Sequence, residues 1–325
     1  MKTQIVYVLS LLLMGMSCSS KTDKSTPEEA VQVSVPEFNA DSAYYYTEQQ
    51  VAFGPRVPNT QAHVDCGNYL ADELRRHGAQ VIEQEVILYN YANTPLNAKN
   101  IIGSFSPEKT NRILLCGHWD SRPYADRDPN PDNYNTPIDG ANDGAGACAA
   151  LLEMARHFGK EAPDLGIDII FFDAEDWGVP EFDTKNTGGW CLGSEYWAKN
   201  PHVHNYFAKY GILLDMVSAK GAEFRKEGYS RANAKNVLDK VWKTASKLGY
   251  GNYFIDSNSH AIVDDHIEVM KYRDFPCIDI VQQILDNETG FGPYWHTLED
   301  NMDSVDKKTL KAVGQTVLHV VYNER

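Results

Sequence analysis

The chain has 325 residues, and its 45 acidic and 30 basic side chains give a formal net charge of -15 at pH 7. This length allows one large α/β domain or two smaller ones. The acidic excess argues against nucleic acid as a partner, because surfaces that bind nucleic acid carry clustered positive charge.

The N-terminus has the pattern of an export signal. Lys2 supplies a positive charge, and the apolar stretch over residues 5–14 is too short for a confident membrane span. The next four residues, Gly-Met-Ser-Cys, resemble the end of a bacterial lipoprotein signal, in which the cysteine, here Cys18, is lipidated and becomes the first mature residue. An ordinary cleaved signal peptide is the alternative.

These features predict three parts of the chain. Residues 1–17 are a signal peptide, residues 18–38 are a lipidated N-terminus with a polar, aperiodic tether, and residues 39–325 are a single folded domain. We expect an exported, periplasmic protein that meets a bacterial membrane only through the lipid on Cys18.

Beyond the tether, helical and strand-like segments alternate. Helices are predicted over residues 40–52, 61–76, 147–158, 194–198, 232–248 and 306–322, and strands over residues 79–89, 99–105, 113–118, 166–172, 211–216 and 275–282. Apolar strands that alternate with helices predict an α/β fold with a central, mostly parallel, twisted sheet flanked by helices. No internal repeat or linker divides this part.

The segment over residues 166–177 is the most informative stretch. Its first half is apolar, β-branched and aromatic, apart from Asp168, which predicts a buried central strand. Asp173, Glu175 and Asp176 follow directly. Neighbouring side chains diverge there, so Asp176 can face a metal while Glu175 faces a substrate, an arrangement suited to metal-assisted acid–base chemistry. The alternative is an acidic, solvated turn.

Further polar residues lie after predicted strands or in loops near them. They are His118, Asp120, Asp143, Asp215, Asp264 and His296. Parallel strands end at one edge of a sheet, so these groups can converge there. Carboxylates and imidazoles are suitable zinc ligands. Each of these residues taken alone is more often a helix cap or a turn residue.

The cysteines after Cys18 have neither CxxC nor zinc-ribbon spacing. They are Cys66, Cys116, Cys148, Cys191 and Cys277. We expect buried free thiols. The odd count excludes complete pairing, although an exported protein could carry one disulfide.

The polar motifs, in this order, resemble those of the zinc aminopeptidase and glutaminyl cyclase superfamily. They are His118-Trp119-Asp120, Asn142-Asp143, Asp173-Ala174-Glu175-Asp176, Leu214-Asp215, Asp265-His266 and Trp295-His296-Thr297. The segment from Asp264 to Ile267 is similar to that of the bacterial relatives of animal-type glutaminyl cyclases. Asp176 is a departure, because the animal enzymes carry a glutamate at this place.

The resemblance implies one zinc ion per chain, held by Asp143, Asp176 and His296. It implies that Glu175 transfers a proton, with Asp215 and Asp264 as a proton-sharing acid network beside it. The substrate pocket would be walled by Trp295, with Trp190 as the first choice and Trp177 as the second choice for a further wall, and with Phe291 contributing.

The expected activity is that of a glutaminyl-peptide cyclotransferase, an acyltransferase that converts the N-terminal glutamine of peptides or proteins to pyroglutamate and releases ammonia. A two-zinc aminopeptidase is the closest alternative, because the same residue types suit its site. A binding lipoprotein with an inactive copy of the fold is a third reading. Glu175 argues against that one, because binding alone gives no reason for a proton acceptor beside a metal ligand.

Overall fold

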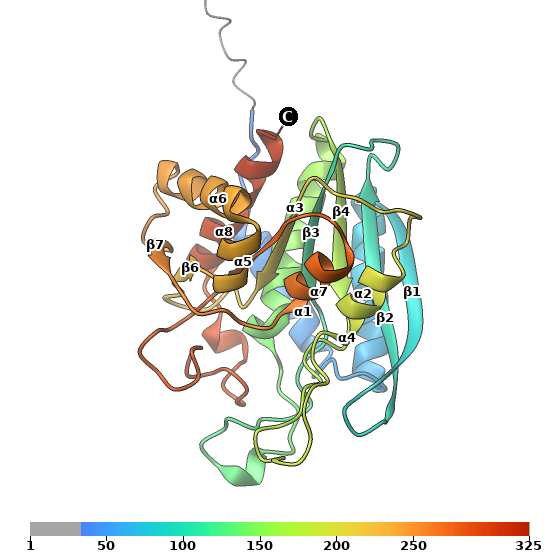
Figure 1. Ribbon diagram of the computed structural model, residues 1–325, viewed down its shortest axis with the longest axis vertical. Coiled ribbons are helices and arrows are strands. Elements are labelled where there is room, and N and C mark those ends of the chain that lie inside the picture. Colours follow the sequence, from blue (N-terminus) through green and yellow to red (C-terminus); the bar gives the residue numbers. More distant parts are fainter. Residues whose placement is uncertain (1–33, 325) are drawn as a thin grey trace, which may run out of the picture. The chain divides into compact units, whose positions relative to one another are not determined.

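A six-stranded mixed sheet organises residues 34–324, the part of the chain that the computed structural model describes (Figure 1). In chain order its strands are β1 (Gln80–Tyr89), β2 (Pro95–Phe105), β3 (Arg112–His118), β4 (Gly166–Phe172), β5 (Gly211–Asp215) and β8 (Cys277–Val281). The spatial order is β1-β2-β4-β3-β5-β8, and the last four run parallel. The predicted α/β fold with a mostly parallel sheet is confirmed.

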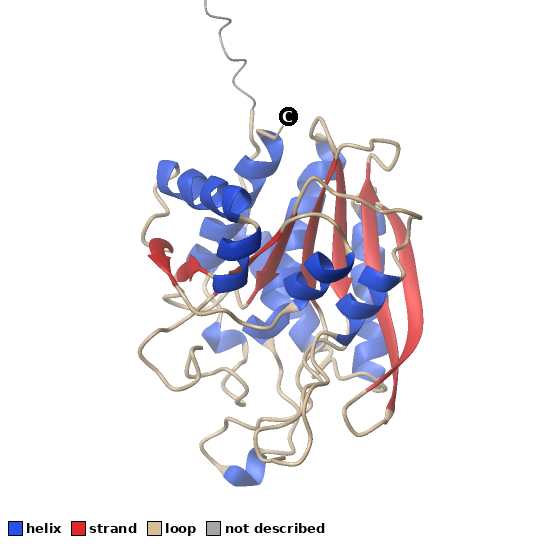
Figure 2. Ribbon diagram, in the orientation of Figure 1, coloured by secondary structure: helices blue, strands red, loops and turns tan. Residues whose placement is uncertain are grey.

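Helices cover both faces of the sheet (Figure 2). One face carries α1 (Ala40–Ala52), α2 (Gln61–Arg76), α3 (Gly146–Lys160) and α8 (Lys307–Tyr322), and the other carries α4 (Leu192–Lys199) and α7 (Asp265–Tyr272). Beside β8 lie α5 (Gly228–Asn233), α6 (Lys235–Lys247) and a small sheet of β6 (Phe224–Lys226) and β7 (Phe254–Asn258). Within residues 34–324, no helix has both the length and the apolar composition needed to cross a bilayer.

The four parallel strands are buried along their whole length, including the charged residue in β4. Asp168 accepts hydrogen bonds from Arg112 Nη2 at 2.8 Å, Ser104 Oγ at 2.6 Å and Tyr206 Oη at 2.7 Å. These donors compensate the buried carboxylate, which would otherwise oppose folding. A single Asp in an apolar strand is therefore compatible with a central position.

Two elements differ most from their predicted extents, whereas the bounds of the other predicted elements agree to within two residues. β2 begins at Pro95 rather than at residue 99, because β1 and β2 form a hairpin whose turn is held by Asn90. The Asn90 side chain accepts hydrogen bonds from the backbone N–H groups of Ala92 and Thr94. The helix predicted over residues 232–248 is divided at Ala234, because α5 packs against β8 whereas α6 packs against α8.

The folded part begins earlier than expected. The signal peptide, Cys18 and the tether up to residue 33 lie outside the described residues. Phe38, placed in the tether from sequence, is buried against α8, and its N–H donates to Gln315 Oε1 at 2.9 Å. Phe38 follows Pro36 and Glu37 and belongs to no helical or strand-like period, so the sequence contains no sign of this contact.

The cysteines of residues 34–324 are all buried and free, as predicted. Cys66 lies on α2, Cys116 on β3, Cys148 on α3 and Cys277 on β8.

Candidate functional site

A cavity of about 190 Å³ opens where the parallel strands β4 and β5 end, at the edge of the sheet where sites form in this architecture. The expected site residues that line it are Asp143, Glu175, Asp176, Trp190, Asp215, Asp264, Phe291, Trp295 and His296. The structure therefore brings together side chains from six separate stretches of the chain.

Three buried side chains form a compact set of metal ligands. Asp143, Asp176 and His296 each present one ligand atom, and these atoms lie within 4.8 Å of one another. His296 Nε2 is 3.4 Å from Asp176 Oδ1 and 3.9 Å from Asp143 Oδ2. Asp176 Oδ2 is buried without a hydrogen-bond partner among the described residues. A buried carboxylate oxygen needs such a partner, and a zinc ion bound by these groups would supply one.

Two further carboxylates hold the loops that carry these ligands. Asp120 accepts hydrogen bonds from the backbone N–H groups of Glu175 and Asp176, at 3.1 and 3.2 Å. Asp300 accepts from Asn142 N at 2.8 Å and Asp143 N at 3.1 Å. Asp120 and Asp300 thus fix the backbone of both ligand loops from positions outside the ligand set.

Asp126 orients the His296 ring through the ring nitrogen that faces away from the other ligands. His296 Nδ1 lies 3.3 Å from Asp126 Oδ1, which leaves Nε2 facing Asp176. Burial opposes ionisation of Asp126, but the hydrogen bonds from Arg122 and the adjacent His296 imidazole hold the pKa of this carboxyl below its usual value. The Trp295 ring stacks on His296 with centroids 3.7 Å apart, and the Trp190 ring lies parallel to it at 6.1 Å.

Asp126→Asn is expected to weaken zinc binding by about 10–100-fold, the usual effect of losing an outer partner of a ligand histidine. The amide keeps the size of the side chain but removes the negative charge beside His296 Nδ1. Competition with a chelator of known zinc affinity measures the change. Asp132→Asn, an exposed carboxyl in the same loop region, is the control and should bind zinc like the wild type. Equal affinity of Asp126→Asn and the wild type would contradict this role.

Glu175 lies beside the ligand set with an unusual environment for a carboxyl group. Its Oε1 accepts a hydrogen bond from the Cys191 thiol at 3.3 Å. Burial and the nearby carboxylates of Asp264 and Asp176 raise the pKa of Glu175 well above its ordinary value. Burial and the adjacent Asp215 raise the pKa of Asp264 to about 7. Carboxyl groups with raised pKa values are suited to transferring protons near neutral pH.

His118 belongs to a second, overlapping set of ligand atoms. Its Nε2 lies 2.9 Å from Asp143 Oδ1 and 3.3 Å from Asp215 Oδ1, and all three side chains are buried. Asp143 is shared with the first set, which is the arrangement that a two-metal site requires. The ligand geometry alone therefore leaves the aminopeptidase alternative open.

Trp177 does not line the cavity, in contrast to Trp190. Its side chain packs against an apolar cluster of Leu96, Ala98 and Ala174, and its ring lies 6.3 Å from that of Tyr124. Trp190 instead lines the cavity beneath the Arg122 guanidinium, 4.7 Å from the ring centroid. The course of the intervening loop decides which indole faces inward, and this course has no signature in the sequence.

Several residues at the cavity have backbone angles that amino acids other than glycine rarely adopt. Ala174, Cys191, Met216 and His296 have φ values of 52°, 57°, 47° and 56°. Such left-handed residues are maintained by surrounding contacts and often gather at functional sites. These residues change the direction of the backbone close to the points where the side chains of Glu175, Asp215 and His296 enter the cavity.

The supporting residues Arg122, Asp126 and Asp300 were not identified from the sequence. Arg122 and Asp126 belong to the long polar stretch after β3, whose length was the one available signal of function. Both are buried, and Arg122 Nη1 reaches Asp176 Oδ1 at 3.2 Å.

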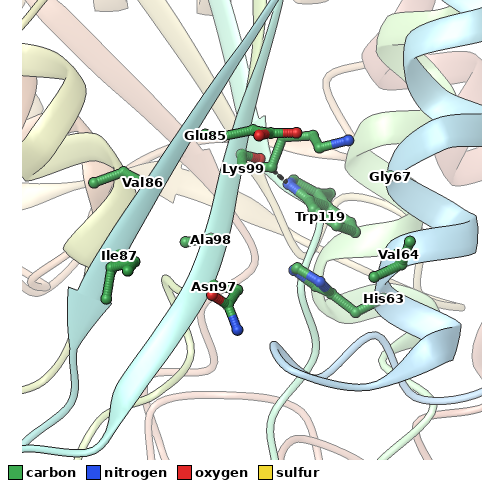
Figure 3. A pocket seen from close by; sticks show the side chains of 10 residues that line it. All are labelled: His63, Val64, Gly67, Glu85, Val86, Ile87, Asn97, Ala98, Lys99 and Trp119. Carbon is green, nitrogen blue, oxygen red and sulfur yellow. Dashed lines mark hydrogen bonds between the residues drawn. The ribbon is translucent and has the colours of Figure 1, made fainter.

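A larger cavity of about 470 Å³ lies between α2 and the β1–β2 hairpin (Figure 3). Figure 3 shows His63 and Trp119 at its α2 side and Ile87 and Lys99 on the strands. Trp119 Nε1 donates to the Lys99 carbonyl at 3.0 Å. None of the candidate ligands or catalytic acids lines this cavity, so the smaller one is the candidate site.

Comparison with known proteins agrees with this geometry. The model of peptidase family M28 matches residues 100–321. A structure of a Zn-dependent exopeptidase from Parabacteroides distasonis is 58% identical, with a TM-score of 0.89 over 90% of this chain and 100% of that chain. Bacteroides thetaiotaomicron glutaminyl cyclase, bound to N-acetylhistamine, is 55% identical, with a TM-score of 0.88 and the same coverage.

A curated sequence relative is the glutaminyl-peptide cyclotransferase of Gloydius blomhoffii. It is 25% identical over 237 residues, which cover 65% of this chain. The matched region spans 61% of that relative's length.

Proposed function

Because this chain belongs to peptidase family M28, whose zinc-dependent chemistry suits the ligand set described above, we propose that it is a glutaminyl-peptide cyclotransferase. Its substrates are peptides or proteins that begin with glutamine. The products are the pyroglutamyl peptide and ammonia. The names of the relatives from Bacteroides thetaiotaomicron and Gloydius blomhoffii support this choice within the family.

The observation that carries the proposal is the position of Glu175. It combines a raised pKa with direct proximity to a three-residue ligand set, in a small cavity with aromatic walls. When bound, zinc would supply Lewis-acid polarisation of the side-chain carbonyl of the substrate glutamine. We assign one zinc per chain to Asp143, Asp176 and His296.

The residues of the chain then account for the proton movements. The α-nitrogen of the substrate forms a bond to its own side-chain carbonyl carbon, and the bond from this carbon to the amide nitrogen breaks. Glu175 accepts the proton from the α-amine and returns it to the departing nitrogen, which leaves as ammonia. The nucleophile is already tethered to the substrate, so the reaction benefits from proximity.

The cavity walls orient the substrate for this step. The indole rings of Trp190 and Trp295 and the ring of Phe291 enclose the side chain of the glutamine. Asp215 and Asp264 share a proton at the wall beside Glu175, because neighbouring buried carboxyl groups resist ionising together. The negative charge of Asp264 adds to the effect of burial in raising the pKa of Glu175.

A peptide that begins Gln-Ala is expected to lose one ammonia and to keep its peptide bonds. Mass spectrometry of the product and an enzymatic assay for ammonia measure this outcome, with a reaction lacking enzyme as the control for spontaneous cyclisation. Release of free glutamine would instead identify an aminopeptidase. Two observations are compatible with this alternative: the second ligand set of His118, Asp143 and Asp215, and the exopeptidase relative. No turnover of either kind would favour the binding lipoprotein.

The location of the protein is also part of the proposal. A lipid on Cys18 would hold the catalytic domain at a membrane on the exported, periplasmic side, where signal cleavage exposes new N-terminal glutamines. Growth with radiolabelled palmitate should label the wild type but not Cys18→Ala. Cys66→Ala removes a buried cysteine and should label like the wild type. Equal labelling of Cys18→Ala and the wild type would exclude the anchor.

A further inference from the structure

A second group of buried ionisable side chains lies behind the cavity wall. Glu227, His266 and Asp279 are each 0% exposed. His266 is in the first turn of α7, Asp279 is the central residue of β8, and Glu227 precedes α5. His266 Nε2 lies 3.3 Å from Glu227 Oε2, and its Nδ1 lies 4.0 Å from Asp279 Oδ2. The imidazole thus stands between two carboxyl groups.

In this array of Glu227, His266 and Asp279, the Glu227 carboxylate is held in place by backbone hydrogen bonds. Its carboxylate accepts hydrogen bonds from the backbone N–H groups of Tyr229 at 2.8 Å, Ser230 at 2.6 Å and Ile262 at 3.1 Å. Burial opposes ionisation, but the contact with His266 and these backbone donors lower the pKa of Glu227 to about 2. Ile262 lines the cavity, so the hydrogen bond from its backbone N–H to Glu227 also holds part of the cavity wall in place.

Asp279 connects the array to Asp264. One ligand atom from each of Asp264, His266 and Asp279 lies within 4.8 Å of the others, so the Asp279 carboxyl lies close to the Asp264 carboxyl. Among the described residues, no N–H or hydroxyl group donates to either Asp279 oxygen. On its other side, Asp264 accepts from Asp265 N at 2.5 Å and caps α7. The Asp264 carboxyl is therefore held between the start of α7 and Asp279.

We propose that Glu227, His266 and Asp279 are positioning residues that hold the Asp264 carboxyl at the cavity wall for the reaction. None of the three lines the cavity, so they act through Asp264. The inference rests on the proposed function, in which Asp264 belongs to the acid network beside Glu175. A displacement of about 1 Å near the reacting groups can cost about 10²-fold in rate, so loss of this support should reduce kcat.

Two substitutions at Asp279 separate the effect of its polar group from the effect of filling space. Asp279→Leu keeps the branched shape of the side chain and removes its polar oxygens. Removing one member of a buried polar group can be strongly destabilising, so kcat is compared only for folded protein. We expect kcat to fall by about tenfold or more, with KM within about twofold and unchanged zinc content. Asp279→Asn keeps a polar group that can donate toward the nearby Asp264 carboxylate, and it should keep kcat within about threefold of the wild type. Ammonia release from the Gln-Ala peptide gives kcat and KM, and thermal unfolding gives Tm.

A matched pair of histidine substitutions tests the same array without changing β8. His266→Gln keeps a donor toward Glu227 but removes the ring nitrogen that faces Asp279, and it should lower kcat in the same way. His157→Gln is the control, because His157 is also buried and its Nε2 lies 3.0 Å from Glu153 Oε1 on α3, away from the cavity. The control should keep the kcat and KM of the wild type. If Asp279→Leu fails to fold, the comparison of His266→Gln with His157→Gln tests the proposal by itself.

The proposal is overturned if folded Asp279→Leu or His266→Gln retains the kcat of the wild type. It is also overturned if Asp279→Asn loses as much kcat as Asp279→Leu, since a polar group beside Asp264 would then not be the relevant property. Failure of the proposed function appears separately, because the wild type itself would then release no ammonia. If the wild type releases free glutamine, the same ratios of kcat between variant and wild type are measured for that reaction.

Discussion

Glu175→Gln is expected to reduce kcat by roughly 10²–10⁴-fold, the contribution of a general acid–base group, while the fold and the zinc content stay unchanged. Glutamine keeps the shape of the side chain and can still contact the Cys191 thiol. It cannot accept and return the proton of the substrate amine. Steady-state ammonia release gives kcat, and elemental analysis of the purified variant gives the zinc content.

The matched control for this substitution is Glu181→Gln. Glu181 lies in the loop that follows Asp176, but its side chain is exposed and pairs with Arg127. Its neutralisation should leave kcat and zinc content as in the wild type. A loss of less than about tenfold for Glu175→Gln would contradict the assigned role in proton transfer.

His296→Ala is expected to release the zinc and to abolish turnover. The substitution leaves only two carboxylates in the ligand set, and three protein ligands are the usual minimum for a catalytic zinc. The wild type should contain one tightly held zinc per chain. Elemental analysis after dialysis against a weak chelator measures both values, and His157→Gln, which changes a buried histidine elsewhere, should keep the zinc.

Two outcomes of the zinc measurement would change the interpretation. Zinc retained by His296→Ala would exclude this residue as a ligand. Two tightly held zinc ions per active wild-type chain would favour the aminopeptidase, with His118, Asp143 and Asp215 as the second set.

The sequence by itself determined the architecture and the chemistry of the site residues. Strands such as β4 are long apolar runs, and their polar ends must meet at one edge because parallel strands point the same way. Local pattern therefore predicted both the sheet and the convergence of Glu175 and Asp215. Helix ends marked by caps, such as those of α1 and α2, also agree with their predicted bounds.

Only the tertiary structure decided which side chains orient these groups. Arg122 reaches Asp176 from 54 positions away, and Asp300 holds Asn142 from 158 positions away. The choice of Trp190 over Trp177, and the proximity of Asp279 to Asp264, also depend on how loops and helices pack. Propensity and periodicity describe neighbours along the chain, whereas these contacts join residues that become neighbours only after the chain has folded.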